Sequence, residues 1–504
     1  MSTDVRSSYK KLITKNKHLI VLSSAEGILH WDMETMMPPK GVGLRSEQLA
    51  LLSSIHHRMS TAPVIGELLK VVLKHPDYET LSEVEKRNVQ LIKKNYDEQT
   101  KLPTKLVAEI AKQQAIAVNT WKKAKATQNF NLFKPELEKL VALNKQAAAI
   151  LMEAKQTKTP YDALLDIYEP KMVAEDIAKI FNSLQSGLEK LLRKIEAATQ
   201  PDTRILSRKV PLEKQRVIAN LLAETLGYDV SSPNAGGRID ETEHPFSTGY
   251  YDDVRITTHY HVDKWTSSVF SVLHEAGHAL YEQGLPQEWK YQPVGAPCSL
   301  GFHESQSRLY ENIIGRSKEF WVSVMPKIED TQVELDEFIR AINVVAPSKI
   351  RIEADEVTYN LHVIIRFQIE KELFADKLTV AELPTVWNQK YEQTLGVKIE
   401  NDSEGVMQDT HWASGLYGYF PTYALGNIYS GQIINKIQQE NPLWREELAK
   451  GNLESVRAWL TRNIYNHGNL YDPAELLEKA TGKKPTVEPY LQYLEEKYRK
   501  LYAL

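Results

Sequence analysis

Two histidines and a glutamate in one short segment have the types and spacing of a catalytic metal site. His274 and His278 are four residues apart, which on a helix places them about 40° apart and one turn along, so both imidazoles can meet one cation. Glu275 follows the first histidine, where its carboxylate can reach a water at the metal without binding the metal. Apolar residues surround the trio, and burying it without a purpose would be costly. We predict a metal site with a general base.

This short pattern also arises by chance, so a third ligand has to support it. After Gly284 the helix is expected to end, a loop containing Pro and Gly follows, and a second helical pattern begins near Gly301. Two helices joined in this way can bring Glu304 beside His274 and His278. Two histidines and one glutamate leave one position open for water, as catalytic zinc requires. We predict one divalent cation per subunit, with zinc as the expected ion.

The elements that must position these residues are mostly helices. Apolar residues recur three and four apart over residues 82–127, 135–157, 173–198, 211–226 and 347–375. A period of two from Asp253 to Val262 predicts a strand, and the turn residues before it predict a small hairpin or sheet set among helices. The charged run from Glu370 to Glu372 is typical of a solvated helix face. With no repeat and no flexible linker, we expect a mainly α fold forming a single domain over residues 1–504.

Composition and charge exclude several classes of partner. A net charge of −4 without a long Lys/Arg block argues against nucleic acid. No window approaches the roughly 18 apolar residues of a spanning helix, so we expect no membrane association. The N-terminal residues lack a signal-peptide core, and the single cysteine, Cys298, fits a reducing compartment. We predict a cytoplasmic protein.

Six motifs in chain order resemble those of the carboxypeptidase Taq family. They are His244-Pro245-Phe246, Asp253-x-Arg255-x-Thr257, His274-Glu275-x-x-His278, His303-Glu304-Ser305-Gln306, Ile350-Arg351-x-x-Ala354-Asp355-Glu356 and Gly405-x-x-Gln408-Asp409-x-His411-Trp412. Upstream, the segment around Trp31 and Asp32 is also similar to the family, so the resemblance covers nearly the whole chain.

The resemblance implies a nearly all-helical fold, with two helical halves flanking a long deep active-site cleft. It also implies a homodimer that removes amino acids one at a time, with broad specificity, from peptides with a free C-terminus. Zinc would be replaceable by cobalt. The small sheet would lie beside the metal site.

Two arginines are candidates for binding the substrate. An enzyme that acts at the C-terminus needs a fixed cation for the terminal carboxylate, and arginine provides a bidentate fork. We predict Arg351 for this role, at the start of a helix and oriented by Asp355 four residues later. The alternative is an ordinary surface pair of these two residues. Arg255, in a motif that the resemblance places in the cleft, is the second candidate and would limit substrate length.

Two further residues are candidates for stabilising the oxyanion of the tetrahedral intermediate, which needs a donor beyond the metal. His411 stands in a stretch punctuated by glycine, where a loop could direct its ring to the site. Tyr423 follows shortly after, and similar peptidases use a His and a Tyr in such roles. A core or surface position is the alternative for Tyr423.

Two other functions stay open on the residues alone. One is a zinc-dependent oligopeptide endopeptidase with the same metal core, which would also cut peptides with an amidated C-terminus. The other is a helical binding protein with a metal site but no turnover. Glu275 argues against the second, because a structural site is usually closed by a fourth protein ligand.

Overall fold

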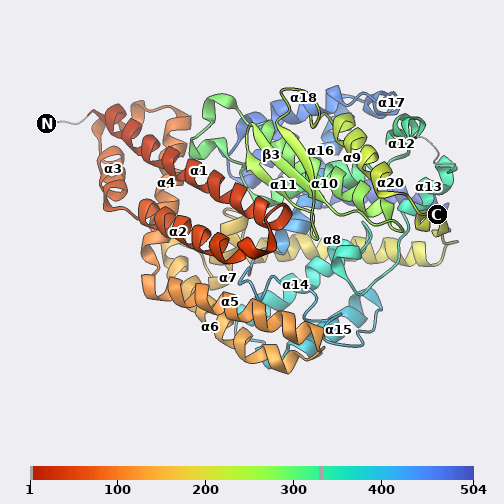
Figure 1. Ribbon diagram of the computed structural model, residues 1–504, viewed down its shortest axis with the longest axis horizontal. Coiled ribbons are helices and arrows are strands. Elements are labelled where there is room, and N and C mark those ends of the chain that lie inside the picture. The colour runs from red at the N-terminus through yellow and green to blue at the C-terminus, as the bar shows by residue number, and fades with distance from the viewer. Residues whose placement is uncertain (1–3, 329–332) are drawn as a thin grey trace.

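Helices make up most of the computed structural model, which describes residues 4–328 and 333–504 (Figure 1). Up to the sheet the helices are α1 (Val5–Thr35), α2 (Val42–Ser60), α3 (Pro63–Leu73), α4 (Glu83–Lys101), α5 (Thr104–Ala126), α6 (Phe130–Lys155), α7 (Pro160–Tyr168), α8 (Ala174–Glu196) and α9 (Leu212–Leu226). After it come α10 (Trp265–Gln283), α11 (Leu300–Arg308), α12 (Lys318–Val324), α13 (Leu335–Ile342), α14 (Tyr359–Phe374), α15 (Leu383–Leu395), α16 (Pro421–Glu440), α17 (Trp444–Ala449), α18 (Glu454–Asn463), α19 (Pro473–Thr481) and α20 (Glu488–Tyr502). The predicted mainly α fold is confirmed.

Local sequence explains where several of these helices begin. α4 starts at a capping box in which Ser82 and Glu85 satisfy each other's backbone N–H groups. α7 starts in the same way with Thr159 and Asp162, and Pro160 occupies its first turn, where a missing N–H costs nothing. The periodic segments 135–157, 173–198 and 211–226 became α6, α8 and α9, and segment 82–127 became α4 and α5. Apolar periodicity therefore predicted these helices correctly.

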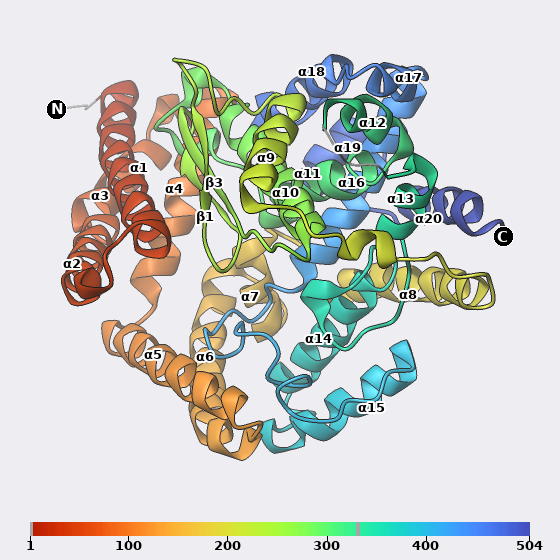
Figure 2. The same cartoon turned by 45° about the vertical axis from the view of Figure 1, so that its right-hand side comes forward.

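A three-stranded sheet interrupts the helices, as the alternating segment predicted. Its strands are β1 (Gly237–Glu241), β2 (Ser247–Tyr250) and β3 (Asp253–Thr258), in the order β1-β3-β2. β3 pairs parallel with β1 and antiparallel with β2, so β2 and β3 form the expected hairpin. Val254 and Ile256 on β3 are buried. The sheet lies between α1 and α10, the helix with the two histidines (Figure 2).

The apolar interior of the described residues consists of two clusters. The larger runs from α5 to α20 and surrounds α10, α11, α14 and α16. The smaller lies among α1, α3 and α4, around Leu12, Ile65 and Val89. In both views these N-terminal helices stand at one side of the molecule (Figures 1 and 2). Within the described ranges, no helix is both long and apolar enough to cross a bilayer.

Two expectations about residues 347–375 were wrong. The helix α14 begins at Tyr359, and only a short 3₁₀ turn, Arg351–Glu353, precedes it. The carboxylate of Asp355 accepts the backbone N–H groups of Val357 and Thr358 and so holds the chain in a turn just before α14. Glu370, expected on a solvated face, has an exposed fraction of 0%.

Candidate metal centre

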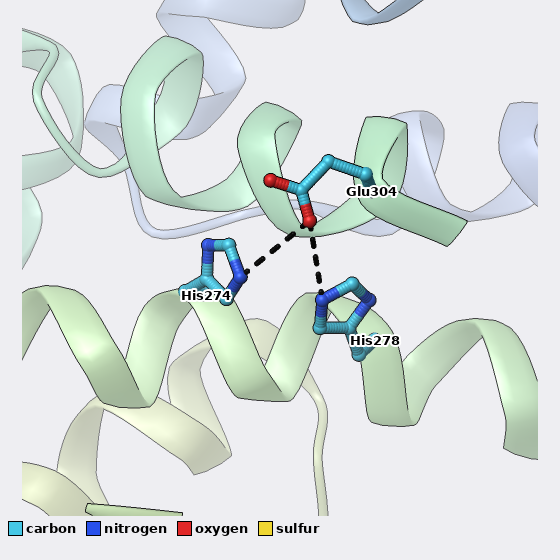
Figure 3. A group of neighbouring side chains, drawn as sticks. All are labelled: His274, His278 and Glu304. Carbon is cyan, nitrogen blue, oxygen red and sulfur yellow. Dashed lines mark ion pairs between the residues drawn. The ribbon is translucent and has the colours of Figure 1, made fainter. Parts of the chain in front are cut away.

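Helices α10 and α11 bring the three predicted ligands together (Figure 3). Oε2 of Glu304 lies 3.8 Å from Nε2 of His274 and 3.5 Å from Nε2 of His278. One ligand atom from each residue lies within 4.8 Å of the others. Two imidazole nitrogens and one carboxylate oxygen are a donor set that suits a catalytic zinc ion, and they leave a position open for water.

Two glycines allow the helices to approach this closely. A Cβ on Gly277, between the two histidines on α10, would lie 2.7 Å from the backbone oxygen of Gln306 on α11. A Cβ on Gly426, on α16, would lie 2.7 Å from Cβ of Glu304. A side chain at Gly277 would therefore push α11 away from α10, and one at Gly426 would displace Glu304 from its place against α16.

Each histidine ligand is oriented by a partner on its other ring nitrogen. Nδ1 of His274 donates to Oε2 of Glu311 at 2.9 Å. Nδ1 of His278 makes a short hydrogen bond with Nδ1 of His303, whose Nε2 donates to Glu282 at 3.0 Å. These bonds aim both Nε2 atoms at Glu304, as outer partners of metal-binding histidines commonly do. Burial lowers the pKa of His278 to about 3, which keeps its ring neutral.

Arg308 holds the third ligand in an ionised form. Its Nε donates to Oε1 of Glu304 at 2.6 Å, and its guanidinium also reaches Glu311 at 3.2 Å. Burial opposes ionisation of Glu304, but Arg308 and His274 hold the pKa of this carboxyl well below its usual range. Oε2 is therefore left as a charged donor toward the histidines.

Sequence reasoning missed Arg308, Glu311, His303 and Glu282. Arg308 and Glu311 follow Glu304 by four and seven residues, a spacing that places them on one helix face and could have identified them. His303 is adjacent to the ligand in its motif. Glu311 lies in a π-helical stretch, Leu309–Ile314, that continues α11, and widened turns of this kind are frequent at functional sites.

Glu275 stands on the wall of a cleft of about 630 Å³, together with His274, His278 and Glu304. Only 6% of the residue is exposed. Burial raises the pKa of Glu275 to about 7, a value suited to a group that takes and returns a proton near neutral pH. The hairpin residues Pro245 and Phe246 line the same cleft, so the sheet lies beside the metal centre as expected.

The structure brings His411 and Tyr423 together. Tyr423, on α16, lines the cleft, and its hydroxyl lies 3.1 Å from Nε2 of His411. His411 stacks on Phe420, and burial lowers the pKa of His411 to about 4, so its ring is neutral at neutral pH. Tyr423 is thus presented to the cleft with a histidine bonded to its hydroxyl.

Arg351 is buried, with an exposed fraction of 5%, so the surface-pair alternative does not hold. Asp355 does not orient it, because that carboxylate bonds the turn before α14. Asp409 does so instead, accepting from Nε at 3.1 Å and from Nη2 at 2.8 Å, while Nη1 donates to Tyr359 at 3.0 Å. The guanidinium lies 4.9 Å from the centre of the Tyr423 ring. Among the described residues, Arg351 and His411 do not line the cleft, but both contact Tyr423, which does.

Arg255 is not brought to the metal centre. Both oxygens of Asp253 accept from its guanidinium, at 2.7 and 2.8 Å. The guanidinium also lies 4.3 Å from the centre of the Trp31 ring, which belongs to α1. Arg255 therefore joins the sheet to the N-terminal helices.

Comparisons with known proteins agree over almost the full length of the chain. The model of the carboxypeptidase Taq (M32) metallopeptidase family matches residues 11–498. Thermostable carboxypeptidase 1 of Thermus thermophilus is 39% identical, over 99% of each chain, and carboxypeptidase 1 of Bacillus subtilis is 37% identical, over 99% of this chain and 100% of that one. The crystal structure of the M32 carboxypeptidase of Deinococcus radiodurans superposes with a TM-score of 0.94 at 36% identity, over 99% of this chain and 100% of that one.

Proposed function

The chain belongs to the carboxypeptidase Taq (M32) family of metallopeptidases. We propose, on this basis, which of its residues remove C-terminal amino acids from peptides and how they do so. It is a metal-dependent carboxypeptidase. The endopeptidase alternative is not favoured, since the named relatives are carboxypeptidases. One observation carries the residue assignment, namely the convergence of two imidazole nitrogens and one carboxylate oxygen on a cleft wall that also bears Glu275.

His274, His278 and Glu304 are the proposed ligands of one divalent cation, and zinc is the proposed ion, with cobalt as a substitute. A cation held there would polarise the scissile carbonyl and make the attacking water more acidic. The donor set supports zinc because imidazole nitrogen and carboxylate oxygen are its usual ligands at catalytic sites. Metal analysis of the purified protein, followed by reactivation of the chelated protein with either ion, tests this identity.

Glu275 is the proposed general base and acid. Its carboxylate takes a proton from the attacking water and delivers it to the amine of the leaving amino acid. Burial supports this role because it keeps the pKa of Glu275 near 7, so the group can accept the proton and release it again. No covalent bond between enzyme and substrate is needed.

Tyr423 and His411 are proposed to stabilise the oxyanion. The Tyr423 hydroxyl lines the cleft and can donate to an oxygen that gains charge during attack. His411 is bonded to that hydroxyl and fixes its direction.

Arg351 is proposed to bind the terminal carboxylate of the substrate. Its guanidinium lies 4.9 Å from the centre of the Tyr423 ring, which lines the cleft, and its bonds to Asp409 and Tyr359 support a fixed cation beside the site. Arg255, held by Asp253 and Trp31, is proposed to limit the length of bound peptides.

Mass spectrometry of a mixed-sequence peptide, offered with a free and with an amidated C-terminus, tests the function. We expect a ladder of single-residue losses from the free C-terminus alone, with broad side-chain preference. Glu275→Gln is the control, and it should keep its metal and lose the ladder. Internal cuts in both peptides would contradict the carboxypeptidase assignment, and a ladder made by Glu275→Gln would contradict the assigned base.

The remaining proposals concern the state of the protein in the cell. We propose a cytoplasmic homodimer, each subunit a single domain over residues 1–504 with two helical halves beside the cleft. The single cysteine and the family resemblance support these proposals. Light scattering of the purified protein tests the dimer, and one cooperative unfolding transition is expected of a single domain.

A further inference from the structure

Glu370 on α14 is a buried carboxylate that none of the roles above uses. Its exposed fraction is 0%. Oε1 accepts from the indole N–H of Trp412 at 2.8 Å, and Oε2 accepts from the backbone N–H of Gly418 at 2.9 Å and from the Tyr161 hydroxyl at 2.8 Å. Burying a carboxyl group costs free energy of folding. A residue of this kind is therefore expected where its hydrogen bonds hold an arrangement that an apolar side chain could not hold.

Two of its partners lie in the irregular segment that carries His411 and Tyr419. Trp412 and Gly418 are near the two ends of this segment, residues 410–420, and within it the backbone N–H of Leu416 donates to the carbonyl of His411 at 2.9 Å. The segment leads directly into α16 and Tyr423. One carboxylate of α14 therefore fixes both ends of the loop in front of α16.

The third partner ties the same carboxylate to α7. Tyr161 lies in the first turn of α7. Gly418 rests against this helix, because a Cβ there would lie 2.9 Å from the backbone nitrogen of Leu165, and its φ of +83° favours glycine. At the other end of α7, the ring of Tyr168 packs edge-on against Tyr419, and both rings line the cleft. The loop is thus held between α7 and α14.

We propose that Glu370 is a positioning residue, which holds the loop 410–420 so that His411 stays bonded to the Tyr423 hydroxyl and that hydroxyl faces the reacting carbonyl. The proposal rests on the oxyanion role proposed above for these two residues. Glu370 touches no substrate and acts only through the loop.

The chemistry of the three donors makes Glu370→Gln a specific test. The N–H groups of Trp412 and Gly418 can only donate, and they meet opposite oxygens of the carboxylate. A glutamine has one acceptor oxygen, so in either orientation its amide N–H₂ faces one of these N–H groups. One buried donor is left without a partner in each case, and the loop should loosen.

Glu169 supplies a matched control. It has an exposed fraction of 1% and also accepts from three donors. Only the backbone N–H of Gly301 is restricted to donating, at 3.0 Å from Oε2, whereas Oε1 meets the hydroxyls of Ser299 and Tyr429. In Glu169→Gln the amide oxygen can keep the N–H of Gly301 while the amide N–H₂ donates to the two hydroxyls, so no N–H is forced to face another N–H, and loop 410–420 should stay unchanged.

Hydrogen exchange followed by mass spectrometry tests whether Glu370 holds the loop. At pH 8, where the carboxyl of Glu370 with its pKa of about 7 is mostly ionised, we expect Glu370→Gln to speed exchange in residues 410–420 without a change in metal content, and Glu169→Gln to leave that exchange as in the wild type. Unchanged exchange in Glu370→Gln, or equal acceleration of exchange in both variants, would overturn the proposal. This outcome does not depend on whether His411 and Tyr423 stabilise the oxyanion.

A double-mutant cycle on turnover tests whether the loop acts through the catalytic pair. We expect Glu370→Gln to lower kcat about 10- to 100-fold, a loss typical of a misplaced catalytic group, with a smaller change in KM. Combined with Tyr423→Phe or His411→Ala, it should add little further loss. Full additivity with both would overturn the positioning role. A wild-type kcat in the single variants Tyr423→Phe and His411→Ala would instead contradict the oxyanion assignment. The hydrogen-exchange result would still decide whether Glu370 orders the loop.

Discussion

Replacing Glu311 with glutamine should weaken binding of the proposed zinc ion while leaving all three proposed ligands in place. Glu311 is charged in the folded protein, because Arg308 and His274 outweigh the effect of burial and lower its pKa to about 2. Its carboxylate accepts from Nδ1 of His274 at 2.9 Å and faces Arg308 and Arg316 at 3.2 and 3.6 Å. A glutamine offers one acceptor oxygen and no charge to these three cationic or polar donors.

The size of the effect follows from that arrangement. Loss of an outer partner of a metal-binding histidine costs about 10- to 100-fold in metal affinity, or about 1.4–2.8 kcal/mol. We expect the upper part of this range, because two arginines compete with His274 for the remaining oxygen. Glu282 is the matched comparison, since His303 stands between it and His278. Glu282→Gln should therefore weaken binding by less than about tenfold.

Competition against a chromophoric chelator at fixed pH and ionic strength measures both dissociation constants. Circular dichroism and thermal unfolding of the metal-free variants establish that each protein is folded. A dissociation constant for Glu311→Gln equal to that of the wild type would refute the reasoning, as would a larger loss in Glu282→Gln than in Glu311→Gln.

Three further predictions concern the substrate side of the site and the fold. Tyr423→Phe should lower kcat about 100-fold or more with zinc content unchanged, and full activity would contradict its assignment. Asp409→Asn leaves the buried guanidinium groups of Arg351 and Arg366 without their carboxylate. The free energy of unfolding in urea should then fall by about 3–5 kcal/mol, whereas an unchanged value would mean that the pairs contribute nothing. Burial raises the pKa of Glu370 from 4.5 to about 7, so its contribution to stability is complete below about pH 4.5 and is lost as the pH rises through 7. The urea midpoint should therefore fall between pH 5 and pH 8 by more in the wild type than in Glu370→Gln, which does not titrate; equal falls would count against this pKa.

Some features of the protein follow from patterns that are short in sequence. The spacing of His274 and His278 and the alternation along β3 depend on the geometry of one helix and one strand, so the sequence alone predicts them. Glu304 could be added because a single loop joins its helix to that of the histidines. The caps of α4 and α7 are local in the same sense.

Other features depend on contacts between distant segments, which no local pattern encodes. Arg351 is oriented by Asp409, 58 residues later, rather than by its neighbour Asp355. Glu370 stands beside Lys371 and Glu372 in a run that resembles a solvated face, yet its donors come from α7 and from the loop before α16. The grouping of the proposed ligands and base could thus be predicted from the sequence, because helical periodicity places His274, Glu275 and His278 and a single loop joins the helix of Glu304 to theirs. The partners that orient the ligands and hold the loop were decided by the tertiary structure, because a buried charge takes whichever donors the packing of distant helices brings to it.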